Sequence, residues 1–121
     1  MKQLNPEVND AFVKELDKPI KLDDETYCTA LFVSHYNING ALAINAFDKH
    51  SELLCTLTVN LNQSDFIDND QFFIQPTEWA QKLAKELEKR GKIKIIDTVK
   101  QNYETYHLAQ IIDANFLKDE D

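Results

Sequence analysis

Residues 26–61 alternate apolar and polar positions in three short runs that predict consecutive β-strands. The first run is rich in β-branched and aromatic residues, and both of its alternating sets contain apolar members, which is typical of a strand covered on both faces for part of its length. An Asn37–Gly40 turn precedes the second run, and Asn-Gly favours the positive φ of a tight hairpin. Such short connections exclude helical crossovers and predict an antiparallel meander. The three runs are 27–36, 41–47 and 52–61.

The second half of the chain changes to a helical period. Trp79, Leu83 and Leu87 recur every four residues, with charged positions between them, and predict an amphipathic helix over 77–90. Gly91 follows as the expected left-handed stop. The polar stretch before this helix predicts a long loop with one short extended piece at 72–74, and 92–112 predicts two further strands.

The N-terminal segment predicts a short helix over 6–17. Asn5 can cap it with Pro6 at its first position, where the missing N–H is not needed. Val8, Phe12 and Leu16 then recur at four-residue spacing on one face. At the other end of the chain, 117–121 predicts a frayed acidic tail.

These elements predict a single α+β domain over 1–121: an antiparallel sheet of four to six strands with the helix at 77–90 packed on it and the short N-terminal helix beside it. Trp79→Ala is expected to be among the most damaging changes, at about 3 to 5 kcal/mol for a large buried aromatic. The expected core comprises Leu31, Val33, Leu42, Ile44, Leu57, Val59, Trp79, Leu83, Leu87, Ile95 and Leu108.

The net charge of −8 is unevenly distributed along the chain. Residues 1–77 carry −7, residues 78–100 carry +3 and residues 101–121 carry −4. An acidic surface repels nucleic-acid phosphates, so we expect a protein partner with a basic surface and no direct binding to nucleic acid. The chain has no apolar run long enough to span a bilayer and its N-terminus lacks a signal region, which together predict a cytoplasmic protein without membrane contact.

The chemistry-bearing residues form no recognisable catalytic or metal-binding pattern. His35, His50 and His107 are scattered, without the paired spacing of zinc ligands, and Cys28 and Cys55 are expected to be reduced, buried thiols. Lysines and glutamates interleave on the helix at ion-pair spacing, which favours a solvated face over a phosphate-binding one. We therefore expect no enzyme activity, no metal and no cofactor.

Two acidic clusters are the candidate partner-binding residues. Asp65, Asp68 and Asp70 are the densest acids in a loop, beside the aromatic Phe66, and they lack the glycine and glutamate of a calcium loop. A second patch consists of Asp23, Asp24 and Glu25. An aromatic anchor within a charged rim is typical of a protein-binding site.

Several short motifs resemble a family of small uncharacterised proteins encoded on bacterial conjugative and integrative elements. The resemblance covers about the last two thirds of the chain and implies a mobile-element setting without an established activity. The motifs are Gly40, Leu42–Ile44, Thr58–Leu61, Phe66–Asp68, Trp79–Ala80 and, more weakly, Tyr103–Leu108.

The function expected from these observations is a non-enzymatic, acidic protein-binding module of a mobile element. Its most concrete version is an inhibitor of a host nucleic-acid-handling defence system, similar to an anti-CRISPR. One alternative is a regulatory or assembly module that self-associates through an edge strand such as 103–112. The other is a small enzyme in which His35 or His107 meets a carboxylate in a pocket.

Overall fold

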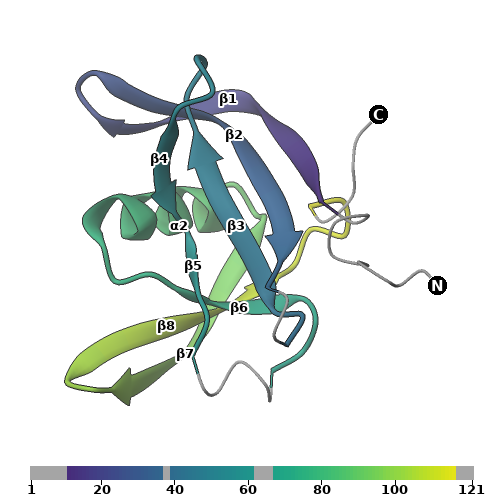
Figure 1. Cartoon of the computed structure of the whole chain (residues 1–121), viewed down its shortest axis with the longest axis vertical. Helices are drawn as coiled ribbons and strands as arrows, with labels where there is room; N and C mark the ends of the chain where they lie inside the picture. The colour runs from purple at the N-terminus through teal and green to yellow at the C-terminus, as the bar shows by residue number, and fades with distance from the viewer. Residues whose placement is uncertain (1–10, 37–38, 62–66, 117–121) are drawn as a thin grey trace.

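The computed structural model describes residues 11–36, 39–61 and 67–116, and within them the chain forms two antiparallel sheets and one helix (Figure 1). The first sheet has four strands in the order β1-β2-β3-β4. It is the predicted meander with one strand added at its N-terminal edge. Its strands are β1 (Phe12–Asp23), β2 (Thr26–His35), β3 (Leu42–Phe47) and β4 (Leu53–Thr56).

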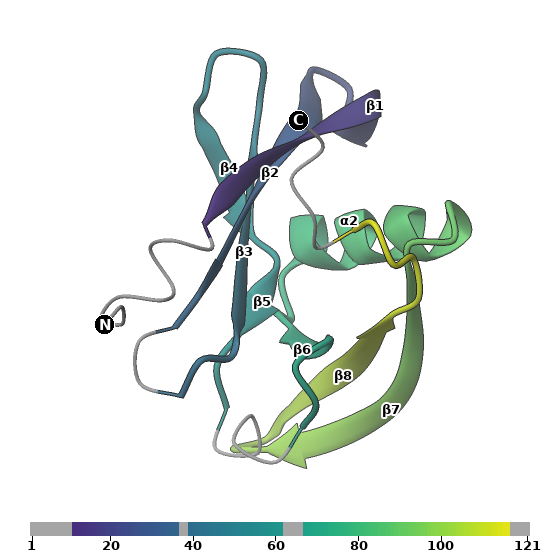
Figure 2. The ribbon, with the colours of Figure 1, turned by 90° about the vertical axis from the view of Figure 1, so that its right-hand side faces the viewer.

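The second sheet has the order β5-β6-β8-β7. Figure 2 shows the helix α2 (Glu78–Lys89) in the angle between the two sheets, facing the inner side of the first. Thr77 and Arg90 flank the helix and Gly91 adopts φ +79°, so the predicted helix and its stop are confirmed. The strands of the second sheet are β5 (Thr58–Val59), β6 (Gln71–Ile74), β7 (Ile93–Gln101) and β8 (Glu104–Ile111).

One continuous core joins both sheets to the apolar stripe of α2. Eight of the eleven predicted core residues are buried, whereas Val59, Trp79 and Ile95 are only half-buried. Phe73 and Leu108 point to the opposite face of the second sheet, where they form a small separate cluster with Leu61. Phe116 closes the main core from beyond the last strand, at 1 % exposure.

The α+β class with antiparallel sheets is confirmed, but the predicted N-terminal helix is wrong where the structure describes it. Residues 12–17 belong to β1, and residues 6–10 lie outside the described residues. Phe12, Lys14 and Leu16 all point inward, and Lys14 is buried, with its Nζ donating to the Asn115 carbonyl at 2.7 Å. Because Lys14 lies between Phe12 and Leu16, the apolar residues alone show a spacing of four. Residues four apart lie on one face of a strand as well as on one face of a helix, so this spacing does not distinguish the two.

The predicted strand over 52–61 is divided between the two sheets, so the expectation of one sheet is also wrong. Leu57 is fully buried at the crossing point: its N–H donates to the Ile44 carbonyl in the first sheet, and its carbonyl accepts from the Gln75 N–H at the end of β6. The Thr58 hydroxyl then accepts from the Ile44 N–H at 3.1 Å. These bonds hold the chain as it leaves one sheet for the other.

Candidate protein-interaction surface

The acids at 23–25 lie on the tight turn between β1 and β2. Hydrogen bonds from the Thr26 side chain and the Glu25 N–H hold the pKa of Asp23 below its usual value. Asp24 lies 3.8 Å from the Lys21 ammonium, and both side chains are largely exposed. The Asp23 carboxylate therefore stabilises the turn, whereas Asp24 and Glu25 present their charges to solvent.

The other predicted acidic cluster leads into β6. Gln71 ties this turn together: its N–H donates to the Asp68 carbonyl, and its side-chain oxygen accepts from the Asp68 N–H at 2.9 Å. Asp68 is exposed and Asp70 is half-buried, while Asp65 and Phe66 lie outside the described residues.

The two acidic clusters are not brought together. The turn at 23–25 and the segment that enters β6 lie at opposite ends of the molecule in both views (Figures 1 and 2). The two clusters therefore cannot contact one small surface of a partner together, and each stays a separate predicted contact.

The face of the first sheet that points away from α2 is unusually apolar. Val13 is 53 % exposed, Leu53 is 58 % exposed, and Phe32 and Phe47 are half-buried beside them. We call these four side chains, with Ala30, the outer face. All of them except Leu53 border a hollow of about 530 Å³, with Glu15 and Asp48 at its margin. An antiparallel sheet with one face on the core normally presents polar residues on the other, so this face needs an explanation.

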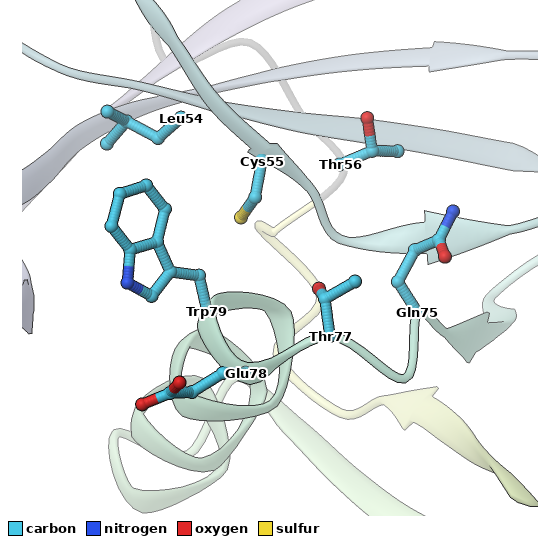
Figure 3. A pocket seen from close by; sticks show the side chains of 7 residues that line it. All are labelled: Leu54, Cys55, Thr56, Gln75, Thr77, Glu78 and Trp79. Atoms are coloured by element: carbon cyan, nitrogen blue, oxygen red, sulfur yellow. The ribbon is translucent and has the colours of Figure 1, made fainter.

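A second hollow lies on the inner side of the same sheet, where β4 passes the start of α2. It has a volume of about 500 Å³, and Trp79 rises into it from the helix toward Leu54 and Cys55 (Figure 3). Thr77 precedes the helix without a side-chain cap, and the Glu78 side chain is 79 % exposed at the rim. Trp79 is therefore a half-buried wall of this pocket that packs against the edge of the main core.

The two cysteines are free and unsuited to nucleophilic chemistry. Burial raises the pKa of the Cys28 thiol to about 11, and burial also raises the pKa of Cys55. Cys28 is on β2 and Cys55 on β4, with β3 between them. Strands two apart are separated by roughly 9 to 10 Å, which exceeds the Cα separation of about 7 Å that a disulfide can bridge.

Neither His35 nor His107 pairs with a carboxylate within the described part of the chain, whereas the His50 N–H donates to the Asp48 carboxylate at 2.8 Å in an exposed turn. His107 shares a hydrogen bond with the Thr98 hydroxyl at 3.2 Å. The Nδ1 atom of His35 is buried without a hydrogen-bond partner, and His35 is on the other sheet. Residues 11–36, 39–61 and 67–116 contain no group of three His, Cys, Asp or Glu residues that could hold a metal ion.

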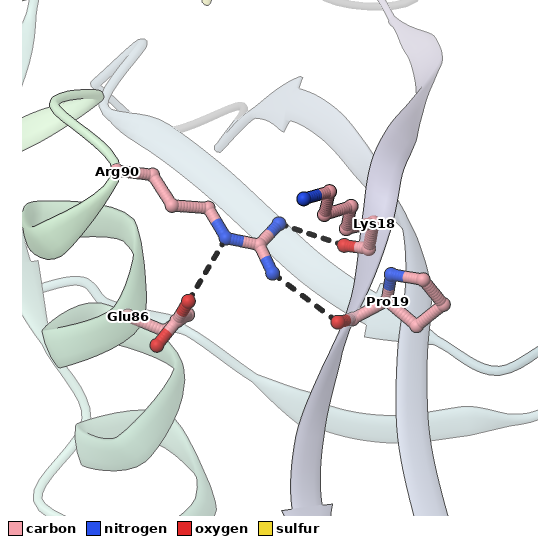
Figure 4. A network of polar contacts seen from close by, with 4 residues as sticks. All are labelled: Lys18, Pro19, Glu86 and Arg90. Carbon is pink, nitrogen blue, oxygen red and sulfur yellow. Dashed lines mark hydrogen bonds and ion pairs between the residues drawn. The ribbon is translucent and has the colours of Figure 1, made fainter.

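The basic residues of the helical region mostly serve the fold. Lys82 donates to the Leu22 carbonyl at 2.9 Å, and Lys92 pairs with Asp113 at the same distance. That pairing, with the Asn115 N–H, lowers the pKa of Asp113. Arg90 binds two carbonyls of β1 and the Glu86 carboxylate (Figure 4). The Glu78–Lys82 and Glu86–Arg90 pairs have the predicted i,i+4 spacing, but Lys82 and Arg90 also bind β1, so this side of the helix is only partly solvated.

The sequence did contain a signal for the outer face. Both alternating sets of 27–36 include apolar residues, which predicts a strand covered on both faces for part of its length. Among the described residues, however, no element packs on the side of Phe32. The Trp79 pocket had no such signal, because it depends on how β4 meets the helix.

The chain matches no family model, no curated protein and no solved structure. Its resemblance to the mobile-element family therefore stays a prediction. Among the residues that the structure describes, the single helix is too short and too polar to traverse a bilayer.

Proposed function

We propose that this protein is a non-enzymatic module that binds a partner protein with a basic surface. The observation that carries the proposal is the outer face, where Val13, Phe32, Phe47 and Leu53 meet solvent on one sheet. Contiguous exposed apolar side chains with a charged rim are typical of protein–protein contacts. The net charge of the whole chain is −8, which attracts a basic partner and raises the rate at which the two proteins associate.

The most specific version of this proposal is an inhibitor of a host nucleic-acid-handling enzyme. Carboxylates such as those of Asp24, Glu25 and Asp68 are exposed and could occupy a basic channel in place of phosphates. The mobile-element setting implied by the sequence resemblance supports this version. A host nuclease that stays fully active at saturating concentrations of the protein would be evidence against it.

The assembly alternative loses its predicted edge. Strand β8, which covers most of 103–112, lies between β6 and β7 in the second sheet. It pairs with β7 along its whole length and with β6 over Leu108 and its neighbours. Self-association through this strand as a long unpaired edge is therefore wrong.

The test is affinity capture from host lysate, followed by association kinetics at several ionic strengths. If acids attract the partner, the on-rate should fall steeply as the Debye length shrinks from about 10 Å at 0.1 M salt to about 3 Å at 1 M. Replacing Asp65, Asp68 and Asp70 by Asn should slow association and leave stability nearly unchanged.

The matched control removes three exposed positive charges instead, from Lys85, Lys89 and Lys94. Changing these to Gln should leave association with a basic partner unchanged or make it faster. The proposal fails if capture recovers no basic protein. It also fails if the on-rate ignores both salt and the Asp→Asn changes.

A further inference from the structure

We infer that the free edge of β4 binds an extended segment of the partner that is apolar on both of its faces and is flanked by lysine or arginine. This inference rests on the proposed function and specifies its contact. Strand β4 pairs with β3 on one side only, and its other side has no strand beside it among the described residues. An added strand would continue the first sheet through main-chain hydrogen bonds.

The other long edges carry features that oppose strand addition. In β7, Ile96 forms a bulge, and the Ile95 N–H already donates to the Glu88 carboxylate at 2.9 Å. Lys94 and Lys100 add exposed charges along the same edge. Bulges, lysines and covered backbone groups are the usual protection of sheet edges.

Strand β1 is protected in a different way. Its pairing with β2 is interrupted between Glu15 and Ile20, and Pro19 lies in the interruption. The carbonyls of Lys18 and Pro19 are bound by Arg90. The fourth edge, β5, has only two residues. Strand β4 reads Leu-Leu-Cys-Thr and has neither proline nor lysine. It has only four residues and a register shift beside Phe47, so a partner strand can form few main-chain hydrogen bonds with it.

Both sides of an added strand would find an apolar surface. Leu53 pairs with Phe47 on the outer face, whereas Cys55 pairs with the buried Ala46 on the inner face, above the Trp79 pocket. Because alternate side chains of a strand point to opposite faces, one set would cover Leu53 and the other would enter the pocket (Figure 3). A single occupant would therefore contact both Leu53 of the outer face and the Trp79 pocket, whereas Val13 on β1 and Phe32 on β2 lie too far from this edge for it to cover.

The charges around this edge select the occupant. Glu52 and Glu78 are exposed there, while Asp48 is half-buried and Lys49 is the opposing charge in the β3–β4 turn. Glu78 also lies 3.6 Å from Lys82, but its side chain is 79 % exposed. A second copy of the chain would bring the same acids against each other, and like charges across a contact are unfavourable. Lysine or arginine on the added strand would instead be attracted.

The test uses a synthetic peptide of about nine residues, within the usual range of strand lengths, in which a central run of valines facing β4 is flanked by lysines. Trp79 is the only tryptophan of the chain, so its fluorescence reports occupation of the pocket directly. We expect a saturable change in Trp79 emission and slower alkylation of Cys55 when the peptide is bound. A peptide methylated on alternate backbone nitrogens, which removes the donors for pairing, should give neither effect.

Two variants distinguish the edges. Leu53→Lys places a charge on the β4 edge, and Ile96→Lys places the same charge on β7, at a residue of similar exposure (58 % and 45 %). We expect Leu53→Lys to weaken peptide binding by about tenfold, since it removes an apolar anchor and repels the lysines. Ile96→Lys should change it by less than about twofold, because that edge is already protected.

Three results would overturn the inference. The first is no change in Trp79 emission up to about 1 mM peptide, the weak end of specific binding. The second is equal weakening by Ile96→Lys. The third is a dimer in sedimentation that Leu53→Lys dissociates, which would make a second copy the occupant. If a basic partner is captured and binds Leu53→Lys as tightly as the parent, the edge is wrong but the proposed function stands.

Discussion

Replacing Arg90 tests what joins α2 to the first sheet. Its guanidinium donates to the Lys18 carbonyl at 2.7 Å and to the Pro19 carbonyl at 3.2 Å, and its Nε lies 3.0 Å from the Glu86 carboxylate (Figure 4). Those two carbonyls belong to the part of β1 that does not pair with β2. Arg90 therefore replaces the sheet hydrogen bonds that the interruption removes.

The expected magnitude follows from the exposure of these groups. The hydrogen bonds from Arg90 to Lys18 and Pro19 are exposed, so water can replace the guanidinium, and each bond contributes about 0.5 to 1.5 kcal/mol. The ion pair with Glu86 has helical i,i+4 spacing and adds about 0.3 to 0.5 kcal/mol. Arg90→Ala should therefore lower the free energy of unfolding by about 1.5 to 3 kcal/mol.

Urea denaturation of a small set of variants checks this division of energy. Glu86→Ala should cost only about 0.5 kcal/mol, and Lys89→Ala, an exposed control on the same turn, should fall within about 0.5 kcal/mol of the parent. The loss in Arg90→Ala should persist at about 1 M salt, because short hydrogen bonds are screened less than exposed ion pairs. If Glu86→Ala cost as much as Arg90→Ala, the carbonyl contacts would not be what holds β1 to the helix.

Three further outcomes follow from burial and backbone geometry. Trp79→Ala should cost less than Leu87→Ala in urea denaturation, because Leu87 is 1 % exposed whereas Trp79 is half-buried; the reverse order would place the indole in the core after all. With iodoacetamide at neutral pH, Cys55 should react before Cys28, whose thiol is fully buried with a pKa raised to about 11; faster labelling of Cys28 would contradict this. Tyr103→Gly should stabilise the β7–β8 hairpin by about 0.5 to 1 kcal/mol in thermal unfolding, since Tyr103 has φ +67° in a fully exposed turn; a loss of stability would indicate that the tyrosine side chain supports the turn.

The elements that sequence patterns predicted best are those whose burial matches a single period. The stripe Trp79, Leu83 and Leu87 has Ala80 and Ala84 beside it, and this mixture of three- and four-residue spacings fits a helix and not a strand. A glycine in the left-handed conformation, Gly91, then ends the helix. The Asn39–Gly40 turn was also recognisable, because Gly40 adopts φ +73° and the Asn39 side chain accepts from the Ala41 N–H. In these places the local chemistry and the tertiary structure agree.

The failures have equally specific causes. The helix predicted over 6–17 is wrong because one of the inward positions of β1 is occupied by Lys14, which a sequence pattern assigns to the surface. Lys14 donates to the carbonyl of Asn115, 101 positions away, and no local pattern can reveal that contact. The apolar residues of the outer face could be recognised in the sequence. The sequence does not show whether another element packs on that face, and none of the described elements does.

The crossing at Leu57 connects the fold to the proposed contact. If 52–61 were one strand in one sheet, as the pattern predicted, β4 would continue past Thr56 instead of ending there. The buried Leu57 and the Thr58 hydroxyl turn the chain into the second sheet, so β4 ends after four residues. Because the chain crosses here, Gln75 bonds to Leu57 and the start of α2 lies next to β4. Trp79 of the helix then lines one pocket with Leu54 and Cys55 of β4. The crossing that makes the one-sheet prediction wrong therefore also brings the start of α2 beside β4 and forms the pocket, which no residue pattern within 52–61 could have indicated.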